Sequence, residues 1–158
     1  AKGIIGQMTK FIPKDENFEA RVQASFARQT AMATLGIEVA RQAAGEVELK
    51  MPYNIAYTQQ HGFIHAGIIT TALDTACGYA AFSLMPDNAA VLTVEFKTNF
   101  LAPARGEHFL FRAHVLKPGR TITVCDGQAF AVDQGEEKLI ATMSCTLMAL
   151  FDREGIAH

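Results

Sequence analysis

Asp74 is the residue whose type and surroundings most directly indicate chemistry. It lies inside the run AGIITTALDTACGYAAFSLM, which would be apolar on nearly every side of a helix. A carboxylate in such a place costs free energy unless a partner satisfies it or a reaction uses it. Two interpretations follow: a structural Asp bonded to Thr70 or to a neighbouring strand, and a catalytic base or nucleophile.

The start of the same helix offers a site for developing negative charge. His65, Ala66 and Gly67 form its first turn, where backbone N–H groups lack helical partners and the helix dipole is positive. A thioester carbonyl under attack becomes an oxyanion, which one preorganised donor stabilises by about 3 to 4 kcal/mol. The alternative is a tight loop-to-helix junction without a chemical role.

Three further residues indicate chemistry less strongly. His61 and His65 have the i, i+4 spacing of a metal pair, but no third ligand has supporting spacing, so we expect no metal. Cys77 has no evident base beside it and is expected to be a buried thiol rather than a nucleophile. Gly78, unfavourable inside a helix, predicts close approach by another backbone.

Hydrophobic periodicity predicts the elements that position these residues. A helix is expected over residues 15–35, with Asp15 as N-cap, and a buried central helix over residues 65–85, closed by Pro86. Six alternating segments indicate strands, joined by turns short enough for antiparallel pairing. The order predicts an α+β fold in which an antiparallel sheet wraps around the central helix. The predicted strands are residues 36–41, 45–52, 90–101, 108–117, 121–133 and 138–150, and residues 53–65 form a loop with one helical turn.

Composition limits the class of protein. With 158 residues, 19% of them charged and 49% hydrophobic, the chain is expected to form a single domain over residues 1–158. A net charge of -2 without a basic stripe argues against a nucleic-acid partner. The three cysteines form no CxxC pair, and neither a signal peptide nor a membrane-spanning run is evident, so we expect a cytoplasmic protein.

Together these features resemble the PaaI-type branch of the hotdog-fold thioesterases. The resemblance rests, in order, on Gln59, the HAG of residues 65–67, Asp74 and the segment TVEFKTNFLAPARG at residues 93–106. It covers nearly the whole chain. It implies the hotdog fold and an acyl-CoA thioesterase activity.

The resemblance also implies a role for each matching residue. Asp74 would be the general base or nucleophile, and the Ala66 N–H would be the oxyanion donor. Gln59 would orient the thioester or the water, His65 would brace the loop, and Thr93 would hold the attacking water. Ala66 replaces the family's usual Gly, and it would be strained if that position required a positive φ.

Substrate-binding residues are expected around the same site. The resemblance implies Gly67, Asn99, Phe100 and Lys117, and Arg120 joins them by its proximity in the KPGR turn. Lys117 and Arg120, together with Lys97 and Arg105, are candidates for the phosphates of coenzyme A, although a solvated hairpin tip is an equal alternative. Apolar walls for an aromatic or medium aliphatic acyl group are expected from Ile64, Ile68, Phe82 and Phe100.

Helix geometry favours a site shared between subunits. Ala66 and Asp74 are eight positions apart, about 12 Å along a helix, so one carbonyl carbon cannot contact both. Two antiparallel helices across a two-fold axis would bring the start of one beside Asp74 of the other. The resembling family is commonly a dimer of dimers, so we expect a homotetramer, with Gln59 and Ala66 from one subunit and Asp74 and Thr93 from its partner.

Three functions are compatible with this sequence. The leading one is hydrolysis of acyl-CoA to free acid and CoA, with no metal or other cofactor. A hotdog hydratase or dehydratase would use His65 and Asp74 to move protons, but the extended His-containing motifs of those branches are missing. A non-catalytic acyl-CoA sensor could use the same fold, but it has no need of a buried carboxylate beside a thioester.

Overall fold

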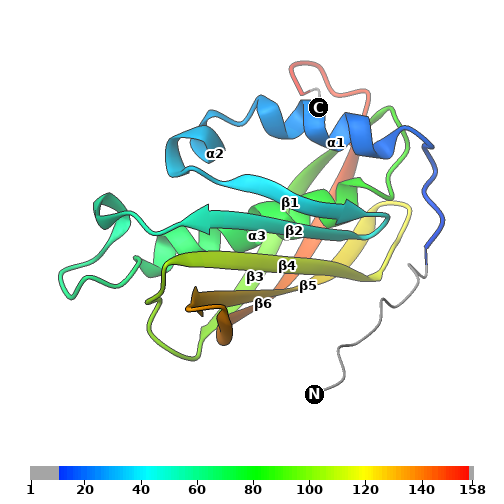
Figure 1. Cartoon of the computed structure of the whole chain (residues 1–158). Helices are drawn as coiled ribbons and strands as arrows, with labels where there is room; N and C mark the ends of the chain where they lie inside the picture. Colours follow the sequence, from blue (N-terminus) through cyan, green and yellow to red (C-terminus); the bar gives the residue numbers. More distant parts are fainter. Residues whose placement is uncertain (1–10, 157–158) are drawn as a thin grey trace.

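A curved antiparallel sheet wraps around one long helix, α3 (Figure 1). The computed structural model describes residues 11–156. Within them, six strands pair in the order β1-β2-β4-β5-β6-β3, every neighbouring pair antiparallel. The elements are α1 (Phe18–Ala27), α2 (Thr30–Leu35), β1 (Glu38–Ala43), β2 (Glu46–Pro52), η1 (Ile55–Tyr57), α3 (Ala66–Phe82), β3 (Ala89–Phe100), β4 (His108–Lys117), β5 (Ile122–Asp133) and β6 (Glu136–Phe151).

The core lies between α3 and the sheet that surrounds it. The strands bury alternate residues, as their sequence pattern predicts: Val47, Leu49 and Met51 on β2 are all buried. The helix comes close to β5 at Gly127, where a Cβ atom would lie only 3.1 Å from Cys77 Sγ. Glycine at this position therefore lets α3 pack directly on the sheet.

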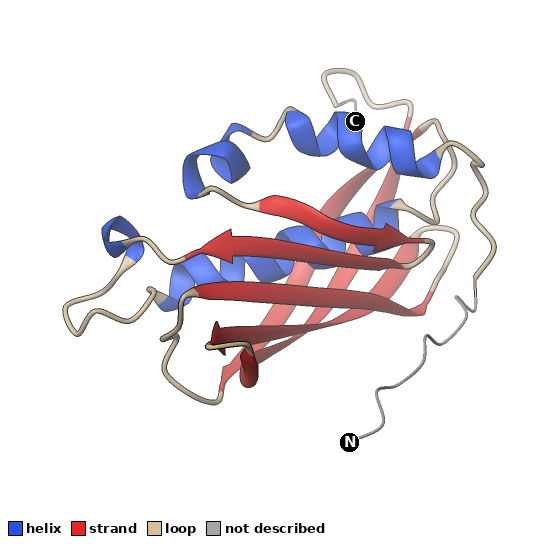
Figure 2. Ribbon diagram, in the orientation of Figure 1, coloured by secondary structure: helices blue, strands red, loops and turns tan. Residues whose placement is uncertain are grey.

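The N-terminal helices α1 and α2 lie along the β1 edge of the sheet (Figure 2). Arg21 of α1 binds the end of α3, donating to the carbonyl oxygens of Phe82 at 3.0 Å and Met85 at 2.8 Å. Its guanidinium also pairs with Asp15 at 3.1 Å and stacks 4.5 Å from the centre of the Phe82 ring. Burial lowers the Arg21 pKa, and Asp15 opposes that shift. Arg21 thus caps the negative end of α3.

The structure confirms the predicted α+β architecture, with all six strands around the central helix and one helical turn in the preceding loop. The predicted N-terminal helix is in fact two helices, and its N-cap is Asn17 rather than Asp15. Asp15 instead accepts from the Asn17 N–H just before the helix, because a short Asp side chain readily closes such a turn. Of the single domain expected over residues 1–158, the first ten and last two residues lie outside the described ones.

The α-helix ends at Phe82, and tighter turns from Leu84 to Ala81 and from Met85 to Phe82 continue the chain to Met85, next to Pro86. The close backbone approach predicted at Gly78 was wrong: among the described residues, a Cβ there would have only Leu147 Cδ2 within 4 Å, at 3.8 Å, and no backbone atom. None of the helices in residues 11–156 is long and apolar enough to cross a membrane.

Candidate active site

The first turn of α3 leaves one backbone donor free. His65 is the N-cap, and its Nδ1 accepts from the Gly67 N–H at 2.9 Å. The N–H groups of Ile68 and Ile69 both donate to the His65 carbonyl. Among residues 11–156 the Ala66 N–H has no acceptor, so it is available to an oxyanion at the positive end of the helix dipole.

Ala66 occupies this position without strain. Its backbone is helical, and the non-glycine residues with positive φ in the described range are Gln134 and Asp152. The strain that would follow from a positive φ therefore does not arise. Space is tight one residue later, because a Cβ on Gly67 would lie 3.2 Å from His65 Nδ1 and would make the ring that caps the helix shift.

An apolar pocket of about 440 Å³ opens beside Ala66. Gln59 also lines it, and the Gln59 Oε1 accepts from the His61 N–H at 2.5 Å. That bond occupies the carbonyl oxygen of the amide and leaves its Nε2 as a donor for a ligand. The other lining residues are Phe63, Ile64, Ile69, Phe100, Leu101, Ala102, Pro103, Ala104, Ile140 and Ala141.

Several of these wall residues were not expected from the sequence. Ile64 and Phe100 line the pocket as predicted, but Ile68 is not among its lining residues, and Phe82 is fully buried beneath Arg21. Sequence reasoning missed Phe63, because a single aromatic in a loop without periodicity carries no directional signal. It also missed Ile140 on β6, since pairing with a distant strand brings it here.

Asp74 lies in the middle of α3, as the sequence indicated, but its side chain is half-buried rather than buried, because the sheet leaves one stripe of the helix uncovered. Its Oδ1 accepts from the Thr93 hydroxyl of β3 at 2.7 Å. Of the two structural partners expected, Thr70 or a neighbouring strand, the structure shows the strand: Thr93 of β3 bonds to Asp74. Asp74 belongs to a stripe of α3 that the sheet does not fully cover, which also includes Gly67, Thr71 and Gly78.

Within one chain the candidate residues form two separate groups. We call Gln59 and the Ala66 N–H the amide half-site, and Asp74 with Thr93 the carboxylate half-site. Ala66 and Asp74 lie eight residues apart on α3, which places them about 12 Å apart along its axis. One subunit alone therefore does not offer both groups to a single carbonyl carbon.

The remaining predicted residues lie on the rim of the molecule. Asn99 is exposed near the end of β3, and Lys117 and Arg120 are exposed at the tip of the β4–β5 hairpin. Arg120 lines a cavity of about 220 Å³ together with Lys14 and Met85, beside the end of α3. This hairpin is therefore at the opposite end of α3 from the amide half-site.

The surroundings of Cys77 are those of a residue packed in the core. Its side chain is fully buried, and a hydrogen bond with the Cys145 thiol, together with burial, raises its pKa well above the usual range. A thiol with a raised pKa is a poor nucleophile. In the part of the chain that the structure describes, no three His, Cys, Asp or Glu side chains are placed to hold a metal ion, and this includes the His61 and His65 pair.

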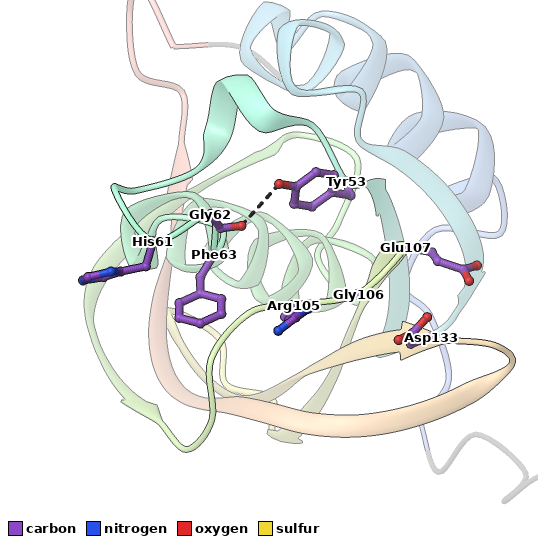
Figure 3. A pocket seen from close by; sticks show the side chains of 8 residues that line it. All are labelled: Tyr53, His61, Gly62, Phe63, Arg105, Gly106, Glu107 and Asp133. Carbon is purple, nitrogen blue, oxygen red and sulfur yellow. Dashed lines mark hydrogen bonds between the residues drawn. The ribbon is translucent and has the colours of Figure 1, made fainter.

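A second, charged cavity also has Phe63 among its lining residues (Figure 3). Its volume is about 710 Å³, and the Tyr53 hydroxyl at its edge donates to the Gly62 carbonyl at 3.3 Å. Arg105, Glu107 and Asp133 supply charged groups, and His61 lies at the opposite rim.

Comparison with known proteins identifies related chains. Residues 61–138 match the model of the thioesterase superfamily. The structure of a thioesterase family protein from Silicibacter pomeroyi is 63% identical, covers 85% of this chain and 98% of that one, and has a TM-score of 0.84. The PaaI protein from the phenylacetic acid degradation operon of E. coli shares the fold, with 21% identity, 85% and 94% coverage and a TM-score of 0.76.

A curated relative also carries the name of an esterase. A protein of Halobacterium salinarum, provisionally named an esterase, is 34% identical over 100 residues, which are 60% of this chain. The match spans 66% of that relative, just under two thirds of its length.

Proposed function

This chain belongs to the thioesterase superfamily and has its hotdog fold, and on that premise we propose that it hydrolyses an acyl-CoA thioester to a free acid and CoA. The observation that carries the proposal is that Asp74, held by Thr93 through Oδ1, has no described partner at Oδ2 and lies on the open stripe of α3. A carboxylate held in this way can take a proton from water or attack a carbonyl itself.

In the water route, Asp74 removes a proton from the water that attacks the thioester carbon. The carbonyl oxygen becomes negative and accepts a hydrogen bond from the Ala66 N–H, with the Gln59 amide as a second donor. The intermediate then expels the CoA thiolate, which takes the proton from Asp74. In the covalent route, Asp74 itself attacks, the thiolate leaves, and water cleaves the resulting anhydride.

We further propose that two subunits build each site. Because Ala66 and Asp74 are separated along one helix, the amide half-site of one subunit would act with the carboxylate half-site of its partner. Lys117 and Arg120 would bind the phosphates of CoA, and Asn99 and Phe100 would contact the substrate near the end of β3. The pairs would assemble further as a dimer of dimers, and the three free buried thiols favour a reducing, cytoplasmic setting.

A panel of acyl-CoA substrates tests the proposal. The purified protein should release free thiol from at least one acyl-CoA, without added metal or cofactor. Loss of the enoyl-CoA double-bond absorbance without thiol release would instead indicate hydration. Tight binding of acyl-CoA with neither reaction would indicate a sensor and would overturn the proposal.

A further inference from the structure

The apolar pocket and the charged cavity meet at one residue. Phe63 lines both of them, and no other residue does so. Figure 3 shows its side chain among the residues of the charged cavity. The apolar pocket also includes the amide half-site, and the charged cavity also includes Arg105, Glu107 and Asp133. Phe63 therefore lies where a space that suits hydrocarbon adjoins a space that suits charge, and we call this residue the partition.

The loop holds this partition in place. The Phe63 carbonyl accepts from the Gln59 N–H at 2.8 Å, and the next residue, Ile64, donates its N–H to the Ala104 carbonyl at 3.0 Å. The preceding Gly62 carbonyl accepts from the Tyr53 hydroxyl. The backbone is therefore bonded at and on both sides of Phe63, which fixes the place from which the ring extends.

The chemistry of the apolar pocket indicates which part of the substrate it would hold. None of its lining side chains is charged, and the polar side chain among them is that of Gln59. The pantetheine arm of CoA carries two amides and leads to phosphates, and burying them here without partners would cost free energy. Burial of a hydrocarbon acyl group in the same space is favourable, because it removes apolar surface from water.

We propose that Phe63 sets the longest acyl group that the enzyme accepts, by ending the apolar pocket at the border of the charged cavity. This inference rests on the proposed thioester hydrolysis. The substrate class is an uncharged acyl group whose far end stops at the Phe63 ring. A longer chain would have to displace that ring or enter the space beside Arg105 and Glu107.

The test is the chain-length profile of kcat/KM for straight-chain acyl-CoAs in the parent and in Phe63→Ala. Removing the ring opens room for roughly four methylene groups at the packing density of a protein interior. Each methylene that enters this room should raise kcat/KM about fourfold. The longest accepted chain should therefore lengthen by about four carbons in Phe63→Ala, and by fewer in Phe63→Leu. It should shorten in Phe63→Trp.

Phe100→Ala is the matched control, since Phe100 lines the apolar pocket but not the charged cavity. Phe100→Ala should widen the pocket, but the longest accepted acyl chain should not lengthen as it does in Phe63→Ala. An equal shift in both variants, or a uniform change in KM at all lengths, would overturn the role of Phe63. The uniform change would mean that the pocket holds the pantetheine arm.

Binding separates this inference from the proposed reaction. The same length series of S-alkyl-CoA thioethers, which cannot be hydrolysed, is titrated into the parent and into Phe63→Ala by calorimetry. If the protein releases no thiol but Phe63→Ala still binds longer thioethers than the parent does, the proposed hydrolysis is wrong and the role of Phe63 stands. If thiol is released but Phe63→Ala neither hydrolyses longer acyl-CoAs nor binds longer thioethers than the parent, hydrolysis stands and the role of Phe63 is wrong.

Discussion

The hydrogen bond between Thr93 and Asp74 fixes the orientation of the candidate catalytic carboxylate. The hydroxyl donates to Oδ1 at 2.7 Å, a charge-assisted bond that is stronger than one between neutral groups. No described residue bonds to Oδ2, so that oxygen is available to a water molecule. The Thr93 hydroxyl thus orients Asp74, whereas its predicted contact with the attacking water stays a prediction.

Asp74→Asn should abolish turnover while the protein stays folded. Asn has nearly the same shape and can still accept from Thr93, but it neither takes a proton nor attacks a carbonyl well, so we expect a loss of at least about 100-fold in kcat. Thiol release and thermal unfolding are measured on the same sample. Asp126→Asn, which faces away from α3 on β5, is the control and should keep parent activity. Activity within threefold of the parent would remove Asp74 from the mechanism.

At the scale of the elements, an irregularity in β3 turns Thr93 toward the helix. The register with β6 shifts between Thr93 and Glu95, so that Thr93 lies opposite Leu147 and Phe96 lies opposite Cys145. Both of those β6 residues are fully buried. Strict alternation back from Phe96 would have pointed Thr93 away from α3. The bulge therefore creates the carboxylate half-site.

Arg21→Ala should weaken the attachment of α1 to the end of α3. Two hydrogen bonds from a charged group to the carbonyl oxygens of Phe82 and Met85 are lost, and we expect a stability loss of about 2 to 3 kcal/mol. In thermal unfolding this corresponds to a fall in Tm of roughly 4–10 °C. The exposed Arg28 on the same segment is the control, and Arg28→Ala should leave Tm nearly unchanged. Equal effects of the two variants would show that Arg21 does not cap α3.

The β4–β5 hairpin should affect substrate binding rather than the chemical step. Lys117→Ala with Arg120→Ala is expected to raise KM for acyl-CoA at least tenfold and to leave kcat within about threefold, because contacts to distant phosphates bind ground and transition states alike. A short acyl-pantetheine substrate without those phosphates is the control and should show no change. An unchanged KM for acyl-CoA would mean that the phosphates bind elsewhere.

At the scale of the whole molecule, one edge of the sheet lacks the protection that isolated sheets normally have. β3 is an edge strand, and its apolar side chains Leu92, Val94 and Phe96 are exposed, with 54% of Val94 accessible. Long apolar edges of this kind favour pairing with another chain. The open stripe of α3 that carries Asp74 is likewise uncovered within one chain. Both features favour the proposed pairing of two copies.

Mixed dimers test the shared site. Asp74→Asn and Gln59→Ala subunits, each expected to be inactive alone, are combined by coexpression or after reversible dissociation. Random pairing makes about half of the dimers mixed, and each mixed dimer has one intact and one doubly altered site, so about a quarter of parent activity should return. Verified mixed dimers that remain inactive would mean that both residues act within one chain.

The sequence by itself determined the local elements and predicted the family. Strand periodicity predicted six strands, and the apolar run around Asp74 predicted a central helix with a conspicuous carboxylate. These features depend on residues close together in the chain, where the spacing of apolar side chains decides which face is buried. The order of Gln59, the HAG tripeptide and Asp74 also indicated the family, which the comparisons bear out.

Only the tertiary structure decided which groups meet. The bulge that points Thr93 at Asp74 and the place of Phe63 on both the apolar pocket and the charged cavity depend on distant pairing partners and on loop hydrogen bonds. The hydrogen bond from Arg21 to the Phe82 carbonyl at the end of α3 is a contact across 61 residues of sequence. Such contacts are set by the packing of the whole chain, because sequence periodicity specifies the face that a residue occupies but not the residue that lies opposite.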